Sequence, residues 1–232
     1  MADDSKLEKE RQERRKKFLD WDAEHELPQE IGDYHFRRID SQEGRIYYAF
    51  GWFNDKNNWK VRVLFDEETM DYMVKSDLHL VTLTEIELIT GDFEEFRRNL
   101  KLLTPPYIEK ELIHREKVSI LVADKEFMTW DYEELLPPSL GHYERGIEPK
   151  MPVLGLNGSY IIAAYECDEK DTGILFFYNM YRDEYYGELR AQGIPGIIHQ
   201  YDAKDLGELV EKMKEHLAKD LEELYNNPVI PE

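Results

Sequence analysis

The stretch that decides the fold is residues 158–225, which read GSYIIAAYECDEKDTGILFFYNMYRDEYYGELRAQGIPGIIHQYDAKDLGELVEKMKEHLAKDLEELY. Short runs of β-branched and aromatic residues occupy 160–165 and 174–178, and the polar segment 168–173 separates them. This order is typical of a β-hairpin, and 196–199 reads as a further strand. Because the apolar residues of each run are consecutive, they point to both faces of a sheet, and we expect both faces to be covered.

From Asp202 onward the apolar residues recur at steps of three and four, which places them on one face of an α-helix. The residues of this stripe are Leu206, Leu209, Val210, Met213, Leu217, Leu221 and Leu224. Asp202 is predicted to be the N-cap, because its side chain can accept a hydrogen bond from a free backbone N–H. The helix is expected to end at Asn226 and Asn227, since Pro228 disfavours the α conformation in the residue before it.

Residues 44–103 repeat this arrangement in outline. Residues 44–53 match 158–167 in the placement of apolar residues, and 92–96 resemble 205–209 as the start of a helix. The pattern predicts an α+β fold with mainly antiparallel sheet and covering helices, arranged as two similar β-β-β-α halves. Two explanations stay open for the similarity: an internal duplication, or chance likeness between two strand–strand–helix segments.

The chain divides into four predicted parts. Residues 1–27 form a charged N-terminal helix or arm, 33–126 a first α+β unit, and 155–226 a second unit closed by the long helix. Between them, 127–154 is rich in proline and glycine and is predicted to be an irregular connection, either an interdomain linker or a functional loop. The locally basic N-terminal segment is either a solvated helix docked by its end or an arm that contacts an acidic surface of the same or another subunit.

Composition limits the partners that the chain can have. Of its 232 residues 41% are apolar and 34% charged, and the formal net charge is -20. Such a chain repels nucleic-acid phosphates, so we expect no direct binding of nucleic acid, and a charged protein partner should be basic. The alternative is that the acidity serves solubility alone. No apolar run is long enough to span a bilayer and no secretion signal is visible, so we expect no membrane association and a cytoplasmic location.

Familiar catalytic motifs are missing from the sequence. It contains no phosphate-binding glycine loop, no G-x-S-x-G elbow and no H-E-x-x-H zinc motif, and we predict no cofactor. The absence of these motifs does not exclude an enzyme whose site is assembled from residues far apart in the sequence. The best candidate is His199, which could act as a general base if Asp202 orients it; the alternative is a partly buried histidine satisfied by the backbone.

Two further groups of residues are candidate sites. Asp20, Asp22 and His25 are potential ligands of a hard cation, but residues two apart on a helix do not converge, so we predict no metal site. A tyrosine-rich group suggests a binding surface, because tyrosine offers a large contact area and a hydroxyl. Its members are Tyr178, Tyr181, Arg182, Tyr185 and Tyr186. The alternative is that these residues simply build a strand, as aromatic residues favour.

The run Ile194-Pro195-Gly196-Ile197-Ile198, followed by the helix after Asp202, resembles the Pro-Gly strand and acid-capped helix of the HicB-type antitoxin domain. That resemblance implies a small basic ribonuclease as partner. The match is confined to this short stretch, and residues 199–201 replace the small polar pattern of such domains, so the chain is not assigned to the family.

Together these observations favour a non-catalytic protein-interaction module, with an inhibitor-, immunity- or antitoxin-like role towards a partner that is basic. The alternatives are an enzyme that uses His199 and nearby carboxylates at a site between the halves, and a structural subunit of a homo-oligomer that assembles through the N-terminal arm.

Overall fold

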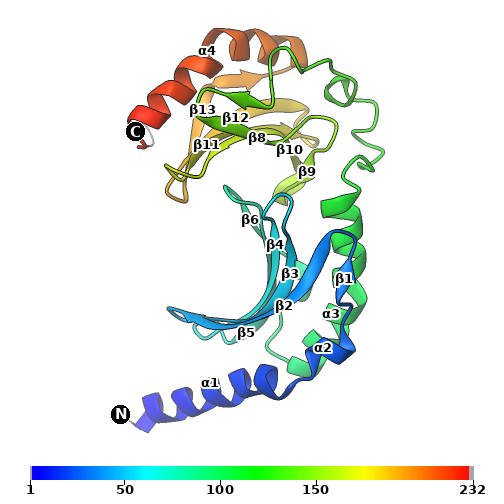
Figure 1. Ribbon diagram of the computed structural model, residues 1–232, viewed down its shortest axis with the longest axis vertical. Helices are drawn as coiled ribbons and strands as arrows, with labels where there is room; N and C mark the ends of the chain where they lie inside the picture. The colour runs from blue at the N-terminus through cyan, green and yellow to red at the C-terminus, as the bar shows by residue number, and fades with distance from the viewer. Residues whose placement is uncertain (1, 230–232) are drawn as a thin grey trace. The chain divides into compact units, whose positions relative to one another are not determined.

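The computed structural model describes residues 2–229 and divides into two compact units, Met1–Glu109 and Lys110–Glu232. Each unit contains an antiparallel sheet and a helix that follows it in the chain (Figure 1). The predicted α+β class with mainly antiparallel sheet is therefore confirmed.

The first unit carries a six-stranded sheet in the order β1-β2-β3-β4-β5-β6, so every strand pairs with its neighbours in sequence. Its elements are α1 (Ala2–Asp20), α2 (Ala23–Glu26), β1 (Glu30–Ile31), β2 (Tyr34–Glu43), β3 (Ile46–Asn54), β4 (Lys60–Asp66), β5 (Asp71–Asp77), β6 (Thr82–Thr84), the 3-10 helix η1 (Ile86–Leu88) and α3 (Phe93–Tyr107), followed by the π-helix η2 (Ile108–Ile113).

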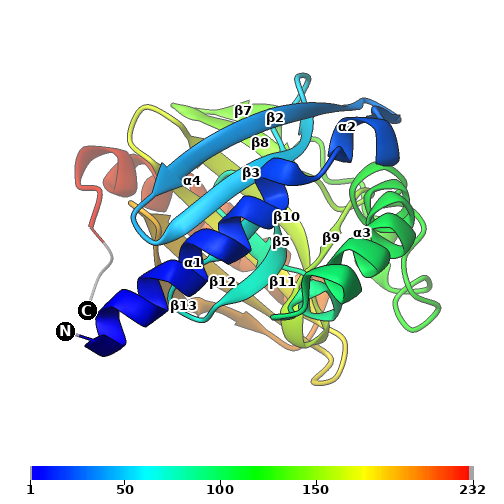
Figure 2. The same ribbon diagram turned by 90° about the horizontal axis from the view of Figure 1, so that it is seen from below.

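Helix α1 is fixed to the first sheet by the aromatic side chain near its C-terminal end. Phe18 is fully buried and meets the rings of Phe50, Tyr72 and Phe96 edge-on. Figure 2 shows the helix crossing over β3. Residues 5–10 of the helix are exposed.

The arginines of α1 contact the helix's own unit. The Nε of Arg11 donates to the carbonyl of Glu67 at 3.0 Å, and an Nη of Arg14 donates to the carbonyl of Met70 at 2.8 Å. Assembly of an oligomer through this arm stays a prediction.

The second unit carries the strand order β13-β12-β11-β10-β8-β7, and β9 also pairs with β10. Its elements are the 3-10 helix η3 (Glu126–Met128), β7 (Ser139–Leu140), β8 (Tyr143–Ile147), β9 (Val153–Leu154), the 3-10 turn η4 (Leu156–Gly158), β10 (Ser159–Cys167), β11 (Thr172–Asn179), β12 (Glu184–Ala191), β13 (Ile194–Ala203) and α4 (Leu206–Asn226).

Helix α4 covers one face of the second sheet (Figure 1). Six of the seven residues predicted for its apolar stripe are buried, and Val210 is partly buried against the same core. The helix ends at Asn226, as the position of Pro228 predicts. Burial of this stripe against β11, β12 and β13 is what stabilises the helix, because propensity alone contributes little to helices in proteins.

The two units share a sequence segment that begins before their sheets. Residues 18–34 and 127–143 align without a gap and are identical at eight positions. The identical pairs are Phe18 and Phe127, Trp21 and Trp130, Asp22 and Asp131, Glu24 and Glu133, Leu27 and Leu136, Pro28 and Pro137, Gly32 and Gly141, and Tyr34 and Tyr143.

Several of these residues have the same structural role in both units. Gly32 and Gly141 have φ of 56° and 62° in the two-residue turns that precede β2 and β8, a conformation that favours glycine. Tyr34 and Tyr143, two positions later, are both fully buried. The shared element order and these shared residues fit a duplication, which stays a prediction.

The helices that close the two units begin with the same cap. Asp92 accepts a hydrogen bond from the backbone N–H of Glu95, and Asp205 accepts one from the backbone N–H of Glu208, both at 2.8 Å. This corrects the prediction that Asp202 caps α4. Strand β13 continues to Ala203, and the extended backbone that a cap needs occurs at Asp205 (φ -142°, ψ 166°).

Residues 127–154 also differ from expectation. Instead of an irregular connection, they contain β7, β8 and β9 within the second unit. Strands β8 and β9 both pair with β10. They are five and two residues long, too short for an alternating pattern to be recognised in the sequence. Their pairing with the long central strand β10 stabilises them.

Candidate functional site

The edge strand β13 opens into a wide bulge beside Tyr186. In β12, Gly187 pairs with Ile198 and Tyr185 pairs with Ala203. Residues 199–202 of β13 therefore lie opposite Tyr186 alone. A bulge of this kind interrupts the ladder and redirects side chains, and bulges are common at sheet edges and next to functional sites.

Tyr201 anchors the bulge to the core. Its side chain is fully buried, its ring meets that of Phe176 edge-on at 5.0 Å, and its hydroxyl donates to Asp220 of α4 at 2.5 Å. Because Tyr201 points inward, the residues around it can point outward. His199, Gln200 and Asp202 are the exposed members of the bulge, and of these His199 and Asp202 line the groove described below.

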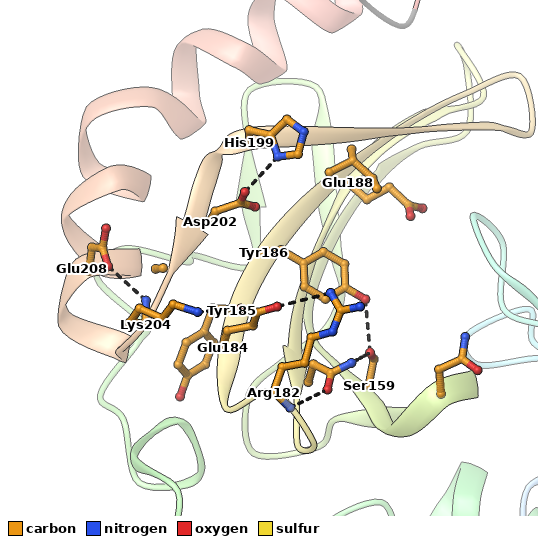
Figure 3. Close-up of a pocket in the computed structure, with 14 residues that line it drawn as sticks. Ser159, Arg182, Glu184, Tyr185, Tyr186, Glu188, His199, Asp202, Lys204 and Glu208 are labelled. Carbon is orange, nitrogen blue, oxygen red and sulfur yellow. Dashed lines mark hydrogen bonds and ion pairs between the residues drawn. The ribbon is translucent and has the colours of Figure 1, made fainter.

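The outward side of the bulge borders a groove of about 600 Å³ (Figure 3). Tyr186 and the acidic residues Glu184 and Glu188 line it from β12, and His199 and Asp202 line it from β13. Successive side chains of a strand point to opposite faces, so residues 184, 186 and 188 lie in one row on the face away from α4. We call this site the Tyr186 groove.

Tyr186 itself is held in place on two sides. Its ring stacks on Phe177 of β11, with centroids 4.8 Å apart and planes 5° from parallel. Its hydroxyl donates to the Oγ of Ser159 at 3.2 Å. Burial raises the pKa of Tyr186, so the ring stays neutral at neutral pH.

The charged side chains of the groove are predominantly acidic. Four carboxylates line it, those of Glu184, Glu188, Asp202 and Glu208, against the two cations of Arg182 and Lys204, which leaves a net charge of -2 when His199 is neutral. The Nζ of Lys204 lies 2.7 Å from Glu184, and this hydrogen bond lowers the pKa of Glu184 below its usual value. Glu188 is paired with Arg190 at 2.5 Å.

The predicted pair of His199 and Asp202 is formed. The Nδ1 of His199 lies 2.8 Å from Oδ2 of Asp202, and the histidine side chain is 84% exposed. The structure therefore brings the two candidate catalytic residues together at the rim of a groove. The histidine is not a buried one satisfied by the backbone.

No family model, no curated protein and no solved structure matches this chain.

The resemblance of residues 194–198 to HicB-type antitoxin domains gains no support from those comparisons.

The tyrosine-rich group splits between core and surface. Tyr178 and Tyr185 are buried in the core under α4, so they do not belong to an exposed surface. Tyr181 and Arg182 lie in the turn between β11 and β12, with the tyrosine 73% exposed, and Tyr186 forms the wall of the groove. Alternation along β12 places Tyr185 inward and Tyr186 outward.

The candidate metal ligands Asp20, Asp22 and His25 do not converge. Asp22 contacts His25 at 2.6 Å, whereas Asp20 approaches Lys16 at 4.0 Å. Within residues 2–229 no group of three or more His, Cys, Asp or Glu side chains is placed to hold a metal ion. Over the same residues no helix is long and apolar enough to cross a membrane.

Sequence reasoning missed several residues that shape the groove, among them Glu188, Ile197 and Lys204. Glu188 was detectable, because the alternation of residues 184–190 marks a strand with charged side chains on one face. Ile197 was assigned only to a strand, and it is 64% exposed in the structure. No local signal places Lys204 beside Glu184, since their contact depends on the bulge.

Proposed function

We propose that the protein is a non-catalytic binding module, and that the Tyr186 groove docks a basic segment of a partner protein. The observation that carries the proposal is the composition of the groove: four carboxylates against two cations, around a neutral aromatic ring. Charge complementarity of this kind guides association and selects partners.

Exposed apolar side chains supplement the charges. Ile197 at the groove is 64% exposed and Tyr181 in the adjacent turn is 73% exposed. Interfaces that bind proteins combine aromatic and aliphatic contact area with a polar rim. The net charge of -20 favours basic partners over the whole surface as well.

Capture of a partner tests the proposal. The chain is immobilised and exposed to an extract of the organism that encodes it, at low and at high salt, with Glu188→Gln/Asp202→Asn as the groove variant. Glu211→Gln/Glu215→Gln, on the exposed face of α4, is the control with the same change of charge. We expect a basic protein that is retained at low salt, released at high salt, lost by the groove variant and kept by the control.

Equal recovery of that protein by both double variants contradicts docking in the groove. Recovery of an acidic protein, or binding that does not respond to salt, contradicts the electrostatic basis of the proposal.

A second candidate function is catalysis with His199 as a general base. The contact of 2.8 Å between Nδ1 and Asp202 supports it, because a carboxylate at one ring nitrogen orients the ring and leaves Nε2 as the proton acceptor. The exposure of the pair weakens it, since catalytic groups gain most in sites that exclude water.

A panel of ester, amide and phosphate-ester substrates distinguishes the two functions. Catalysis requires turnover that is lost in both His199→Ala and Asp202→Asn. If no substrate is turned over, or if turnover survives both substitutions, His199 is not a general base and binding is the function that the groove supports.

A further inference from the structure

We infer that the slot between the Tyr186 ring and the bulge of β13 binds the guanidinium of an arginine side chain on the partner. This inference rests on the proposed function and names the group that the groove recognises.

The contact requires the face of the Tyr186 ring that is turned away from Phe177. Phe177, its neighbour on β11, covers the other face in parallel stacking at 4.8 Å. On the opposite side, towards β13, regular pairing is interrupted and only the bulge of residues 199–202 lies across from Tyr186. The groove occupies this place (Figure 3). A neutral aromatic face beside a gap attracts a cation through the ring quadrupole.

Carboxylates flank the ring on both sides. Glu184 and Glu188 are two residues before and after Tyr186 on the same face of β12, which places each about 7 Å along the strand from it. Asp202 approaches from the bulge, and its side chain is 51% exposed. A cation that stacks on Tyr186 is therefore within reach of Glu184 or Glu188 along β12 and of Asp202 across the groove.

The two cations that line the groove do not close it, and Arg190 pairs with only one of the two carboxylate oxygens of Glu188, Oε1, at 2.5 Å. Arg182 and Lys204 pair with Glu184 at 3.5 Å and 2.7 Å, but their side chains are 75% and 77% exposed. Exposed ion pairs contribute little to stability, so an incoming cation can displace them at small cost. Both side chains are mostly exposed, so they can swing into solvent.

The geometry of the slot favours arginine over lysine. A guanidinium is planar, so it can stack on the Tyr186 ring while its N–H groups point in the plane towards Asp202 and Glu188. The ammonium of lysine is a compact charge without a plane and cannot combine both contacts in this way. Recognition should therefore depend on the shape of the cation as well as on its charge.

Three short peptides that differ only in the type of side chain at two equivalent positions test the inference. Acetylated and amidated peptides of the pattern Gly-X-Gly-X-Gly, with X as arginine, lysine or the neutral citrulline, are titrated into the full-length protein at low ionic strength and followed by NMR of backbone amides. We expect the arginine peptide to bind about two- to fivefold more tightly than the lysine peptide, which corresponds to one exposed cation–π contact, with shifts at residues 184–188 and 199–203. The citrulline peptide should not bind.

Substitutions of Tyr186 identify the source of that preference. Tyr186→Leu should remove the difference between arginine and lysine, while Tyr186→Phe, which keeps the ring and loses only the bond to Ser159, should preserve it. Tyr225→Leu is the control, because Tyr225 is also a tyrosine beside a carboxylate, Glu169, and does not line the groove.

Several results overturn the arginine slot: equal affinity for the arginine and lysine peptides, a preference for arginine that survives Tyr186→Leu, or shifts outside the groove. None of these decides the broader proposal of a basic partner, which the capture experiment tests through Glu188 and Asp202.

Discussion

The ring of Tyr201 lies so close over Gly187 that a Cβ added to Gly187 would be 2.9 Å from Cδ2 and 3.0 Å from Cβ of the tyrosine. Gly187 belongs to β12 and pairs with Ile198, the last residue before the bulge. The absence of a side chain at this position lets Tyr201 enter the core, and His199 and Asp202 are displayed on the groove side as a result. Core packing and the candidate site are therefore coupled at this pair.

Gly187→Ala should destabilise the second unit. Tyr201 is fully buried and bonded to Asp220, so it cannot move away without breaking other contacts. We expect a loss of about 1–3 kcal/mol in the free energy of unfolding, as for other overpacked cores, measured by urea denaturation.

The control for this substitution is Gly207→Ala in the first turn of α4. The added Cβ meets only Asp205 Oδ1, at 3.3 Å, and alanine has the higher helix propensity. This variant should be clearly less destabilising than Gly187→Ala, because the neighbour that must move is one side-chain oxygen at the surface and not a buried ring. Equal destabilisation by both substitutions contradicts the role of the Tyr201 ring.

Tyr201→Phe should cost stability through the lost hydrogen bond to Asp220. Burial raises the pKa of Tyr201 well above its usual value, so the hydroxyl remains a donor at neutral pH. A hydrogen bond to a charged acceptor contributes about 1.5–3 kcal/mol. The measurement is a double-mutant cycle with Asp220→Ala, and additive losses would show that the two side chains do not interact.

Asp205→Ala and Asp202→Ala distinguish the cap that the structure has from the cap that the sequence suggests. Loss of the bond from Asp205 to the backbone N–H of Glu208 should reduce stability by about 1 kcal/mol. Asp202 contacts His199 on the surface, and its removal should change thermal stability by clearly less. A larger loss for Asp202→Ala contradicts the observed cap.

The contrast between those two residues illustrates what sequence can predict. The apolar stripe of α4 is a local pattern and was predicted residue by residue. The cap was not, because Asp202 and Asp205 are chemically equal and only the extent of β13 decides between them. Whether the backbone is extended at either position depends on pairing with β12, which is information about tertiary structure.

The groove could be predicted only in part for a similar reason. The pair of His199 and Asp202 and the residue Tyr186 were found from residue type. In the sequence Tyr185-Tyr186, however, a shift of one residue in register exchanges the buried and the exposed ring. The bulge that separates Tyr186 from β13 has no signature in a single sequence, so the sequence could not predict the slot.

The lowered pKa of Glu26 predicts that the stability of the first unit depends on pH. Hydrogen bonds from Lys101 and then Arg97 of α3 lower the pKa of Glu26 from 4.5 to about 2. A folded-state pKa below the unfolded value means that the charged form stabilises the folded state. This contribution is fully present above pH 4.5 and is lost as the pH falls towards 2.

Glu26→Gln should therefore lower the free energy of unfolding at pH 7 by about 1 kcal/mol, a modest value because the ion pairs are partly exposed. The difference from wild type should shrink steadily between pH 4.5 and pH 2. Glu94→Gln, whose carboxylate lies 3.7 Å from Arg97 and is 76% exposed, is the control. A difference that is constant over this pH range contradicts the assignment.

The last prediction concerns the free edge of β13, which is an edge strand of the second sheet in the described part of the chain. Gln192 and Gly193 have φ of 52° and 76°, which is the two-residue turn typical of tight hairpins. In such a turn the closing residues, here Ala191 and Ile194, bond to each other. The backbone groups of alternate residues then face outward, so the outward positions include Pro195 and Ile197.

Proline has no backbone N–H, so Pro195 removes a donor from the exposed edge, and the bulge at residues 199–202 ends the regular ladder soon after it. Both features prevent another chain from adding a strand there. Pro195→Val should restore the donor, raise β propensity and cause self-association that grows with protein concentration, measured as the mass in sedimentation velocity. Ile194→Val is the matched control, because the backbone groups of Ile194 point towards β12 and not to the free edge. This variant should leave the mass unchanged. A concentration series in which Pro195→Val behaves like the control would show that the bulge alone protects the edge.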